Sequence, residues 1–258
     1  MSKPTLVLVH GSWHSPEHFG PLIEDLTTHG YKCVPVSLPS TQSPDEPPAN
    51  LTDDTLAVRS TVEVELAKNN VIVIAHSYGG TPTNNALKDL STASRHAAGH
   101  KTSVLSLIFL AAIILPPDTT FLAALGGHPH PIHELRTPDF AWVGPPGPEH
   151  YFYNEMPPEE ATKWAGKLRV QSWRAYTEAT TYAAYREIEC FYLRTRRDRA
   201  IPFEMQGGLL EGVEKDGGRV RWEAVDADHT PFIGKSLGAT SEFVRRVAEG
   251  RFDEKVVE

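Results

Sequence analysis

Apolar runs recur along the chain and alternate with stretches in which apolar residues have helical spacing. Near-continuous apolar runs of five to about ten residues are typical of strands buried on both faces of a sheet. Runs of this kind at residues 5–10 and 71–75, and further apolar-rich segments at 33–38, 104–114, 188–195 and 220–225, predict six strands. The segment at 33–38 contains Pro35, which cannot donate a ladder hydrogen bond, so this strand is expected near a sheet edge.

Between these runs, the apolar residues fall on single helical stripes. Ser15 and Pro16 fit the N-cap and first position of a helix, and Gly30 fits its end. Further helices are predicted from the stripe around Val58, from residues 81–90, from residues following Asp198 and from the stripe around Phe243. Strands that alternate with helices indicate βαβ units, and hence an α/β fold with a mostly parallel sheet of about six strands and helices on both faces.

Residues 116–186 break this alternation. The segment opens with a loop rich in proline, glycine and histidine, continues with predicted helices at 159–168 and 171–185, and holds most of the aromatic residues. We therefore interpret it as an inserted helical cap on a core formed by residues 1–115 and 187–258. Some of its aromatic rings are expected to line a pocket, while others pack the cap onto the core.

Composition narrows the class of protein. The chain has 258 residues, of which 40% are apolar, and a net charge of −8, which argues against a nucleic-acid surface. The run at 104–117 is too short to span a bilayer, and the N-terminus shows no signal-peptide pattern. Two cysteines, Cys33 and Cys190, cannot form a disulfide framework. The expectation is a cytoplasmic protein with no membrane partner, and the sequence leaves its oligomeric state open, including a homodimer.

The apolar run at 71–75 ends in the sequence Ala75-His76-Ser77-Tyr78-Gly79-Gly80. A strand followed by a serine between small residues, and then by a helix, is the pattern of a nucleophile elbow. Ala75 occupies the position usually held by glycine and adds one methyl group. The turn would present the Ser77 hydroxyl near a helix N-terminus, so we predict Ser77 as a nucleophile rather than as part of an ordinary turn.

A serine hydroxyl needs a nearby base to act as a nucleophile at neutral pH. In elbow proteins the acid and then the base follow the serine along the chain. His229 lies just past the last predicted strand, and Asp198 follows the strand before it. Asp118 is the alternative acid. Asp226 and Asp228 are too close to His229 along the chain to reach its far ring nitrogen easily and are expected to cap the loop.

The oxyanion formed in acyl transfer needs two donors that are in place beforehand. The backbone N–H of Tyr78 and that of Ser12, in the loop that follows the first strand, are the predicted pair. Gly11 would allow this close approach. A metal site at His10 and His14, or at the cap histidines His128, His130 and His133, is not favoured, and no metal or cofactor is expected. From this loop and the cap, the pocket candidates are Trp13, His14, Phe121, Trp142, Trp173 and Tyr182.

Four segments in order carry a family resemblance: His10-Gly11-Ser12-Trp13-His14, the elbow, Asp198-Arg199-Ala200-Ile201-Pro202 and Asp228-His229-Thr230-Pro231-Phe232. Together they resemble the α/β-hydrolase superfamily, and most closely the small esterases similar to plant methyl-salicylate esterases and hydroxynitrile lyases. The resemblance covers nearly the whole chain except the cap. It implies an eight-stranded type of sheet, of which this chain is expected to have the six-stranded core, and it supports Ser77, Asp198 and His229 as a triad. Hydroxynitrile lyases of this branch carry a lysine after the histidine, where this chain has Thr230.

Three functions compete at this level. The favoured one is a serine hydrolase that cleaves an ester or lactone of a small apolar or aromatic molecule through an acyl-enzyme on Ser77. The second uses the same triad for C–C bond cleavage or cyclisation in secondary metabolism. The third is a receptor that binds a small molecule without chemistry. Hydrolases with a nucleophilic aspartate are disfavoured because the elbow holds Ser77.

Overall fold

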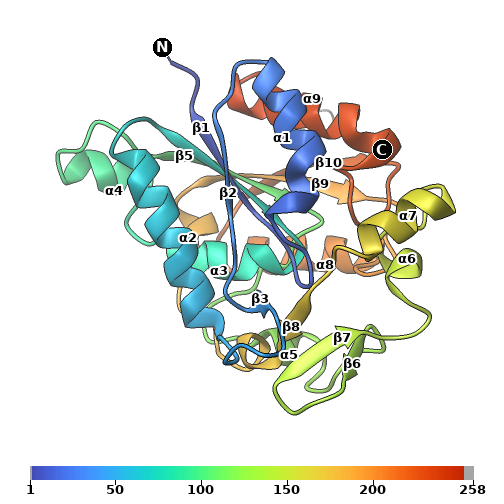
Figure 1. Cartoon of the computed structure of the whole chain (residues 1–258). Coiled ribbons are helices and arrows are strands. Elements are labelled where there is room, and N and C mark those ends of the chain that lie inside the picture. Colours follow the sequence, from blue (N-terminus) through green and yellow to red (C-terminus); the bar gives the residue numbers. More distant parts are fainter. Residues whose placement is uncertain (1, 253–258) are drawn as a thin grey trace.

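The computed structural model describes residues 2–252 and is built around a six-stranded sheet (Figure 1). The strand order is β10-β9-β5-β4-β1-β2, and every pair of neighbours is parallel. The strands are β1 (Thr5–Val9), β2 (Cys33–Val36), β4 (Val71–His76), β5 (Val104–Leu110), β9 (Glu189–Thr195) and β10 (Val220–Val225). This confirms the predicted α/β fold, including the edge position of the strand that contains Pro35.

Two apolar cores cover the two faces of the sheet, because alternate residues of each strand point to opposite faces. Val7, Val73 and Phe109 belong to one core, whereas Leu8 and Ile108 belong to the other. The first core includes residues of α2 (Leu51–Leu66), α3 (Gly80–Ala86) and α8 (Phe203–Lys215). The second includes residues of α1 (Gly20–Thr28) and α9 (Leu237–Ala248), which lie side by side (Figure 1). The remaining core helix is α4 (Thr92–Ala97).

The segment between β5 and β9 forms the cap, and the prediction that it is helical is wrong in part. It contains β6 (His133–Leu135), β7 (Phe140–Val143) and β8 (Val170–Ser172), besides α5 (Phe121–Ala124), α6 (Pro148–Tyr151) and α7 (Pro158–Ala165). These strands join β3 (Thr41–Gln42) in an antiparallel sheet of order β3-β8-β7-β6.

The helix predicted at 171–185 is absent from the described chain. In its place stand β8 and the short 3-10 helices η3 (Trp173–Tyr176) and η4 (Ala184–Arg186). Other 3-10 helices are η1 (Pro16–Phe19), η2 (Ser77–Gly79) and η5 (Gly234–Ser236). Pairing of β8 with β3, far away in the sequence, fixes an extended backbone at 170–172, so tertiary contacts override the local pattern there.

The parallel sheet places the catalytic candidates together. Strands β1, β4, β9 and β10 run in the same direction, so the segments after their carboxyl ends meet at one edge. Those segments carry Ser12, Ser77, Asp198 and His229. Within residues 2–252, no helix combines the length and apolar character that crossing a membrane requires.

Candidate active site

Ser77 occupies a sharp turn between β4 and the helical residues that follow. Its backbone φ is 53°, a left-handed conformation that is uncommon for a residue with a side chain. Gly79 makes the turn possible, because a Cβ there would lie 2.5 Å from the carbonyl oxygen of His10. The Ser77 carbonyl in turn accepts a hydrogen bond from the Ile113 N–H at 2.9 Å. This is the geometry expected of a nucleophile elbow.

Ser77, His229 and Asp198 form a continuous hydrogen-bonded chain. His229 Nε2 lies 3.0 Å from Ser77 Oγ, and His229 Nδ1 lies 2.8 Å from Asp198 Oδ2. The carboxylate can only accept, so Nδ1–H donates to Asp198, and Nε2 is left to accept the proton of Ser77. The His229 and Asp198 side chains are almost completely buried. The three residues predicted as a triad thus lie together in the order that proton transfer requires.

Asp198 is held by its own loop and by α8. Its Oδ1 accepts from the N–H groups of Ala200 and Ile201, each at 2.8 Å, and Thr195 Oγ1 donates to its Oδ2 at 2.9 Å. Gln206, which the sequence reasoning missed, is fully buried and donates to the Thr195 and Ile201 carbonyls. A lone polar residue on the apolar side of the predicted helix was the available signal for Gln206.

The alternative acid and the neighbouring charges lie outside this chain of hydrogen bonds. Asp118 is exposed. Asp226 pairs with Arg197 at 2.6 Å, and Arg199 Nη1 lies 3.1 Å from His150 Nδ1. Asp228 caps its loop, as predicted, because its Oδ1 accepts from the Thr230 N–H at 3.1 Å.

The loop after β1 packs directly against the nucleophile. A Cβ on Gly11 would lie 2.5 Å from the Ser77 Cβ, so only glycine allows this approach. Ser12 follows and is buried. Trp13 has a φ of 62°, and its Nε1 donates to the Ala141 carbonyl of the cap at 2.9 Å. The backbone N–H groups of Ser12 and Tyr78 belong to the two segments that meet here. The Tyr78 side chain points elsewhere, donating to Asp54 Oδ2 at 2.7 Å.

Buried neutral histidines support this loop and the base. His14 Nδ1 lies 2.8 Å from the Ser12 carbonyl, and Tyr153 Oη lies 3.2 Å from His14 Nε2. His76 Nε2 lies 2.9 Å from the His229 carbonyl. Desolvation holds the pKa values of His14 and His76 well below the usual range, so both rings stay neutral and can donate one N–H each. The His10 side chain accepts a hydrogen bond from the Leu38 N–H through Nε2 at 3.1 Å.

A cavity of about 240 Å³ opens beside Ser77 and His229. Two of the predicted pocket residues, Trp13 and Phe121, line it. The sequence reasoning missed Phe152, Tyr176 and Met205. The aromatic content of the cap was a signal for the first two, whereas Met205 in α8 gave none. The full lining is Ser12, Trp13, Ser77, Ile113, Phe121, Ala124, Leu125, His130, Ile132, His133, Phe152, Tyr176, Ala200, Ile201, Pro202, Met205 and His229.

The other four pocket candidates do not line this cavity. His14 is buried behind the loop after β1, between Ser12 and Tyr153. Trp173 does not line the cavity but packs against the ring of Tyr176, with 5.1 Å between the ring centroids. Trp142 lines a separate surface cavity of about 380 Å³, and Tyr182 donates its hydroxyl to Glu187. The number of aromatic residues in the cap indicated a pocket, but not which rings face it.

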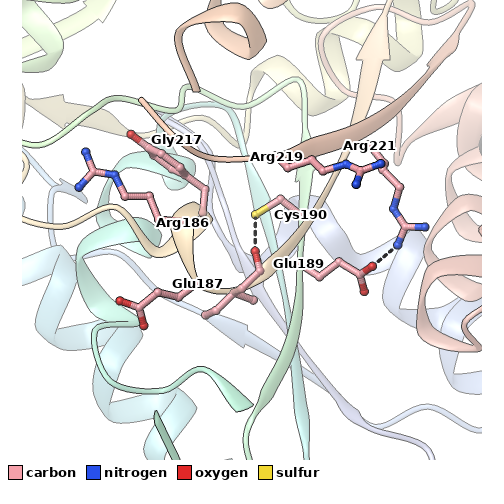
Figure 2. Close-up of a pocket in the computed structure, with 9 residues that line it drawn as sticks. Arg186, Glu187, Glu189, Cys190, Gly217, Arg219 and Arg221 are labelled. Carbon is pink, nitrogen blue, oxygen red and sulfur yellow. Dashed lines mark hydrogen bonds and ion pairs between the residues drawn. The ribbon is translucent and has the colours of Figure 1, made fainter. Parts of the chain in front are cut away.

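A larger cavity, of about 410 Å³, lies at the opposite ends of β9 and β10 (Figure 2). Its lining includes arginine and glutamate side chains, and several of these form ion pairs. Arg221 pairs with Glu189, and Arg186 pairs with Asp216 at 2.6 Å. Cys190 donates to the Ile188 carbonyl at 3.1 Å, and burial raises the pKa of its thiol. The cavity therefore offers no activated nucleophile, in contrast to the edge that carries Ser77.

Comparisons with known proteins agree with this fold. Residues 6–238 match the sequence profile of the family described as "Alpha/beta hydrolase family". The chain is 29% identical to "Probable hydrolase R7" of Phoma sp. (strain ATCC 20986 / MF5453) over 90% of its own length and 93% of that protein. Among solved structures, polyneuridine aldehyde esterase matches 95% of the chain and 99% of its own, with a TM-score of 0.74 at 16% identity. Tomato methylketone synthase I, complexed with 2-tridecanone, matches 98% and 100% with a TM-score of 0.74 at 14% identity.

Proposed function

Because this chain belongs to the alpha/beta hydrolase family, we propose that it is a serine hydrolase that cleaves a carboxylic ester or lactone of a small apolar or aromatic molecule. The observation that carries the proposal is the unbroken hydrogen-bonded chain from Ser77 Oγ through His229 to Asp198. The fold shared with an esterase is consistent with it.

The chemistry follows from the positions of the polar atoms. Ser77 Oγ attacks the carbonyl carbon while its proton passes to His229 Nε2, and Asp198 stabilises the imidazolium. The Ser12 and Tyr78 N–H groups hold the oxyanion. The intermediate collapses when His229 returns the proton to the leaving oxygen. Water then attacks the acyl carbon, giving its proton to His229, and Ser77 leaves with that proton as the acid is released.

The size and lining of the cavity support the proposed substrate class. Apart from the catalytic groups, its wall is made mainly of apolar side chains, including Ile113, Phe121, Ile132, Phe152 and Met205. A volume of about 240 Å³ is below the usual range for sites that bind drug-sized ligands. The site therefore suits a small ester or lactone with apolar or ring-containing parts.

The test is the intact mass of the protein after exposure to a fluorophosphonate, with Ser77→Ala as the control. One adduct on the wild type and none on the variant is the expected result, and turnover of a panel of esters and lactones should disappear with the same substitution. A folded wild-type protein that takes no adduct would contradict the proposal.

C–C bond cleavage or cyclisation with the same residues is the second candidate, because the fold is shared with a methylketone synthase. Hydroxynitrile lyases carry a lysine at the position that Thr230 occupies in this chain, so the lysine of that lyase activity is missing here. Thr230 is fully buried and its Oγ1 donates to the Phe152 carbonyl at 3.0 Å. Activity that survives Ser77→Ala would favour proton-transfer chemistry over hydrolysis. Tight ligand binding without turnover would favour a receptor.

A further inference from the structure

Two hydroxyl groups meet in the wall of the catalytic cavity. Ser12 Oγ, from the loop after β1, lies 2.5 Å from Tyr176 Oη, from η3 of the cap. The Tyr176 side chain is fully buried and that of Ser12 nearly so, and both residues line the cavity beside Ser77. This hydrogen bond links the predicted oxyanion loop to the cap.

The pair holds one more hydrogen than its mutual bond uses. Each hydroxyl has one hydrogen, and the bond between them consumes one of the two. Within residues 2–252, neither of the two hydroxyl oxygens has another hydrogen-bond partner. A buried donor without an acceptor is unfavourable, so the remaining hydrogen is expected to find its acceptor in the molecule that fills the cavity.

Acidity decides which hydroxyl keeps that hydrogen. Geometry allows either oxygen to donate, but a phenol is a stronger acid, and hence a better donor, than an aliphatic alcohol, so we assign Tyr176 as the donor and Ser12 as the acceptor. Burial raises the pKa of Tyr176 above its usual value, which keeps the phenol protonated. The Ser12 O–H is then the free donor.

The surroundings of Tyr176 keep its hydroxyl in place. Its ring stacks on Phe121 at 4.3 Å between centroids and meets His133 and Trp173 edge-on at 5.4 and 5.1 Å. On the other side, the Ser12 carbonyl accepts the hydrogen bond from His14. Both halves of the pair are therefore fixed before any substrate enters.

We propose that the Ser12 hydroxyl is a third hydrogen-bond donor to the oxyanion, and that Tyr176 is the positioning residue that holds and polarises it. This inference rests on the proposed serine-hydrolase function. As Ser77 attacks, the carbonyl oxygen gains charge and can accept the two backbone N–H groups and the Ser12 O–H together. No proton is transferred from Ser12. A hydroxyl that itself accepts a hydrogen bond is a stronger donor, which is the contribution of Tyr176.

The test is a double-mutant cycle with p-nitrophenyl acetate and p-nitrophenyl butyrate as substrates. Ser12→Ala is expected to lower kcat by about 10²- to 10³-fold with little change in KM, because the bond strengthens only as charge develops. Tyr176→Phe is expected to lower kcat on the order of tenfold. In the Ser12→Ala background Tyr176→Phe should have no further effect, since it acts through Ser12. Ser12→Thr, which keeps the hydroxyl, should recover most of the loss.

Tyr182→Phe is the matched control, because it removes a cap tyrosine hydroxyl that bonds to Glu187 outside the cavity. Its kcat should stay at the wild-type value, and circular dichroism should show that all variants fold. Unchanged kcat in Ser12→Ala, or an equal loss from Tyr176→Phe in both backgrounds, overturns the inference alone. A folded wild type that neither hydrolyses these esters nor takes a fluorophosphonate adduct overturns the proposed function and this inference together.

Discussion

At the scale of single residues, the bond from His229 Nδ1 to Asp198 Oδ2 decides which ring nitrogen faces Ser77. Asp198→Asn keeps the shape of the side chain but can present an N–H to Nδ1, which favours the wrong tautomer. We expect kcat for ester hydrolysis to fall by about 10⁴-fold. Asp118→Asn is the matched control, because Asp118 is exposed and should not affect kcat. If Asp118→Asn lowered kcat as much as Asp198→Asn does, the assignment of Asp198 as the acid of the triad would be wrong.

Gly11 gives a second prediction at this scale. A methyl group there would lie 2.5 Å from the Ser77 Cβ, so the Gly11→Ala protein must move the loop or the nucleophile. A displacement of about 1 Å at a reacting group can cost on the order of 10²-fold in rate, and we expect kcat to fall by at least that much. Gly20→Ala serves as the control, since a methyl group there meets nothing within 4 Å. The kcat values of the two variants should differ sharply in steady-state kinetics. Equal kcat values would mean that the loop can accommodate a methyl group at residue 11 without displacing Ser77.

At the scale of elements, α8 contains a glycine, Gly208, that the local structure does not require. Gly208 lies exposed inside the helix, and a Cβ there would meet nothing within 4 Å. Gly208→Ala should raise the free energy of unfolding by about 0.5–1 kcal/mol, because alanine loses less backbone entropy in a helix.

Gly217, just past the end of the same helix, has equally open space but a φ of +84°. Gly217→Ala should instead destabilise the protein by about 1–2 kcal/mol, the cost of a left-handed conformation for a residue with a Cβ. Urea unfolding of both variants separates conformation from packing. A gain in stability at both positions would show that the backbone at residue 217, past the end of α8, can leave the left-handed conformation at no cost.

The elements also differ in how far sequence could predict them. The six strands of the parallel sheet were predicted within a few residues, because each carries its own apolar-rich segment and its own turn residues. The cap strands were missed, because β8 has only three residues and its extended form depends on β3 and β7. Fully buried Gln171 shows the dependence, since its side chain accepts from Thr41 and donates to Ser40, both far away in the sequence, besides donating to the Ser172 carbonyl of its own strand.

At the scale of the whole molecule, burial of neutral histidines predicts a loss of stability in mild acid. Desolvation lowers the pKa of five histidines, to about 4 for three of them and well below the usual range for the other two: His10, His18, His133, His14 and His76. Their unfolded pKa is about 6.5. Between these values the unfolded chain binds more protons, so stability is complete above about pH 6.5 and is lost as the pH falls towards 4.

Asp54 opposes this trend. Burial raises the pKa of its carboxyl from 3.8 to about 6, so the folded state takes up one proton as the pH falls through 6 and gains stability. Each excess proton on the unfolded chain costs roughly 1.4 kcal/mol per pH unit. The histidines outnumber Asp54, so the net effect remains destabilising.

The measurement is the free energy of unfolding in urea at pH 7 and at pH 5. It should be lower at pH 5 by several kcal/mol. The variant His133→Phe should show a weaker pH dependence, by about one proton, because it removes one of the five groups. Equal stability of the wild type at the two pH values would show that these rings titrate normally in the folded protein.

The sequence by itself determined the α/β architecture, the strand order along the chain and the identity of Ser77 and His229 as candidates. These depend on apolar periodicity and turn chemistry, which a few neighbouring residues encode. Only the tertiary structure decided that Asp198 rather than Asp118 meets His229, which cap rings line the cavity, and that Tyr176 reaches Ser12 across 164 positions. Such contacts depend on how separate elements pack, and no local pattern carries that information.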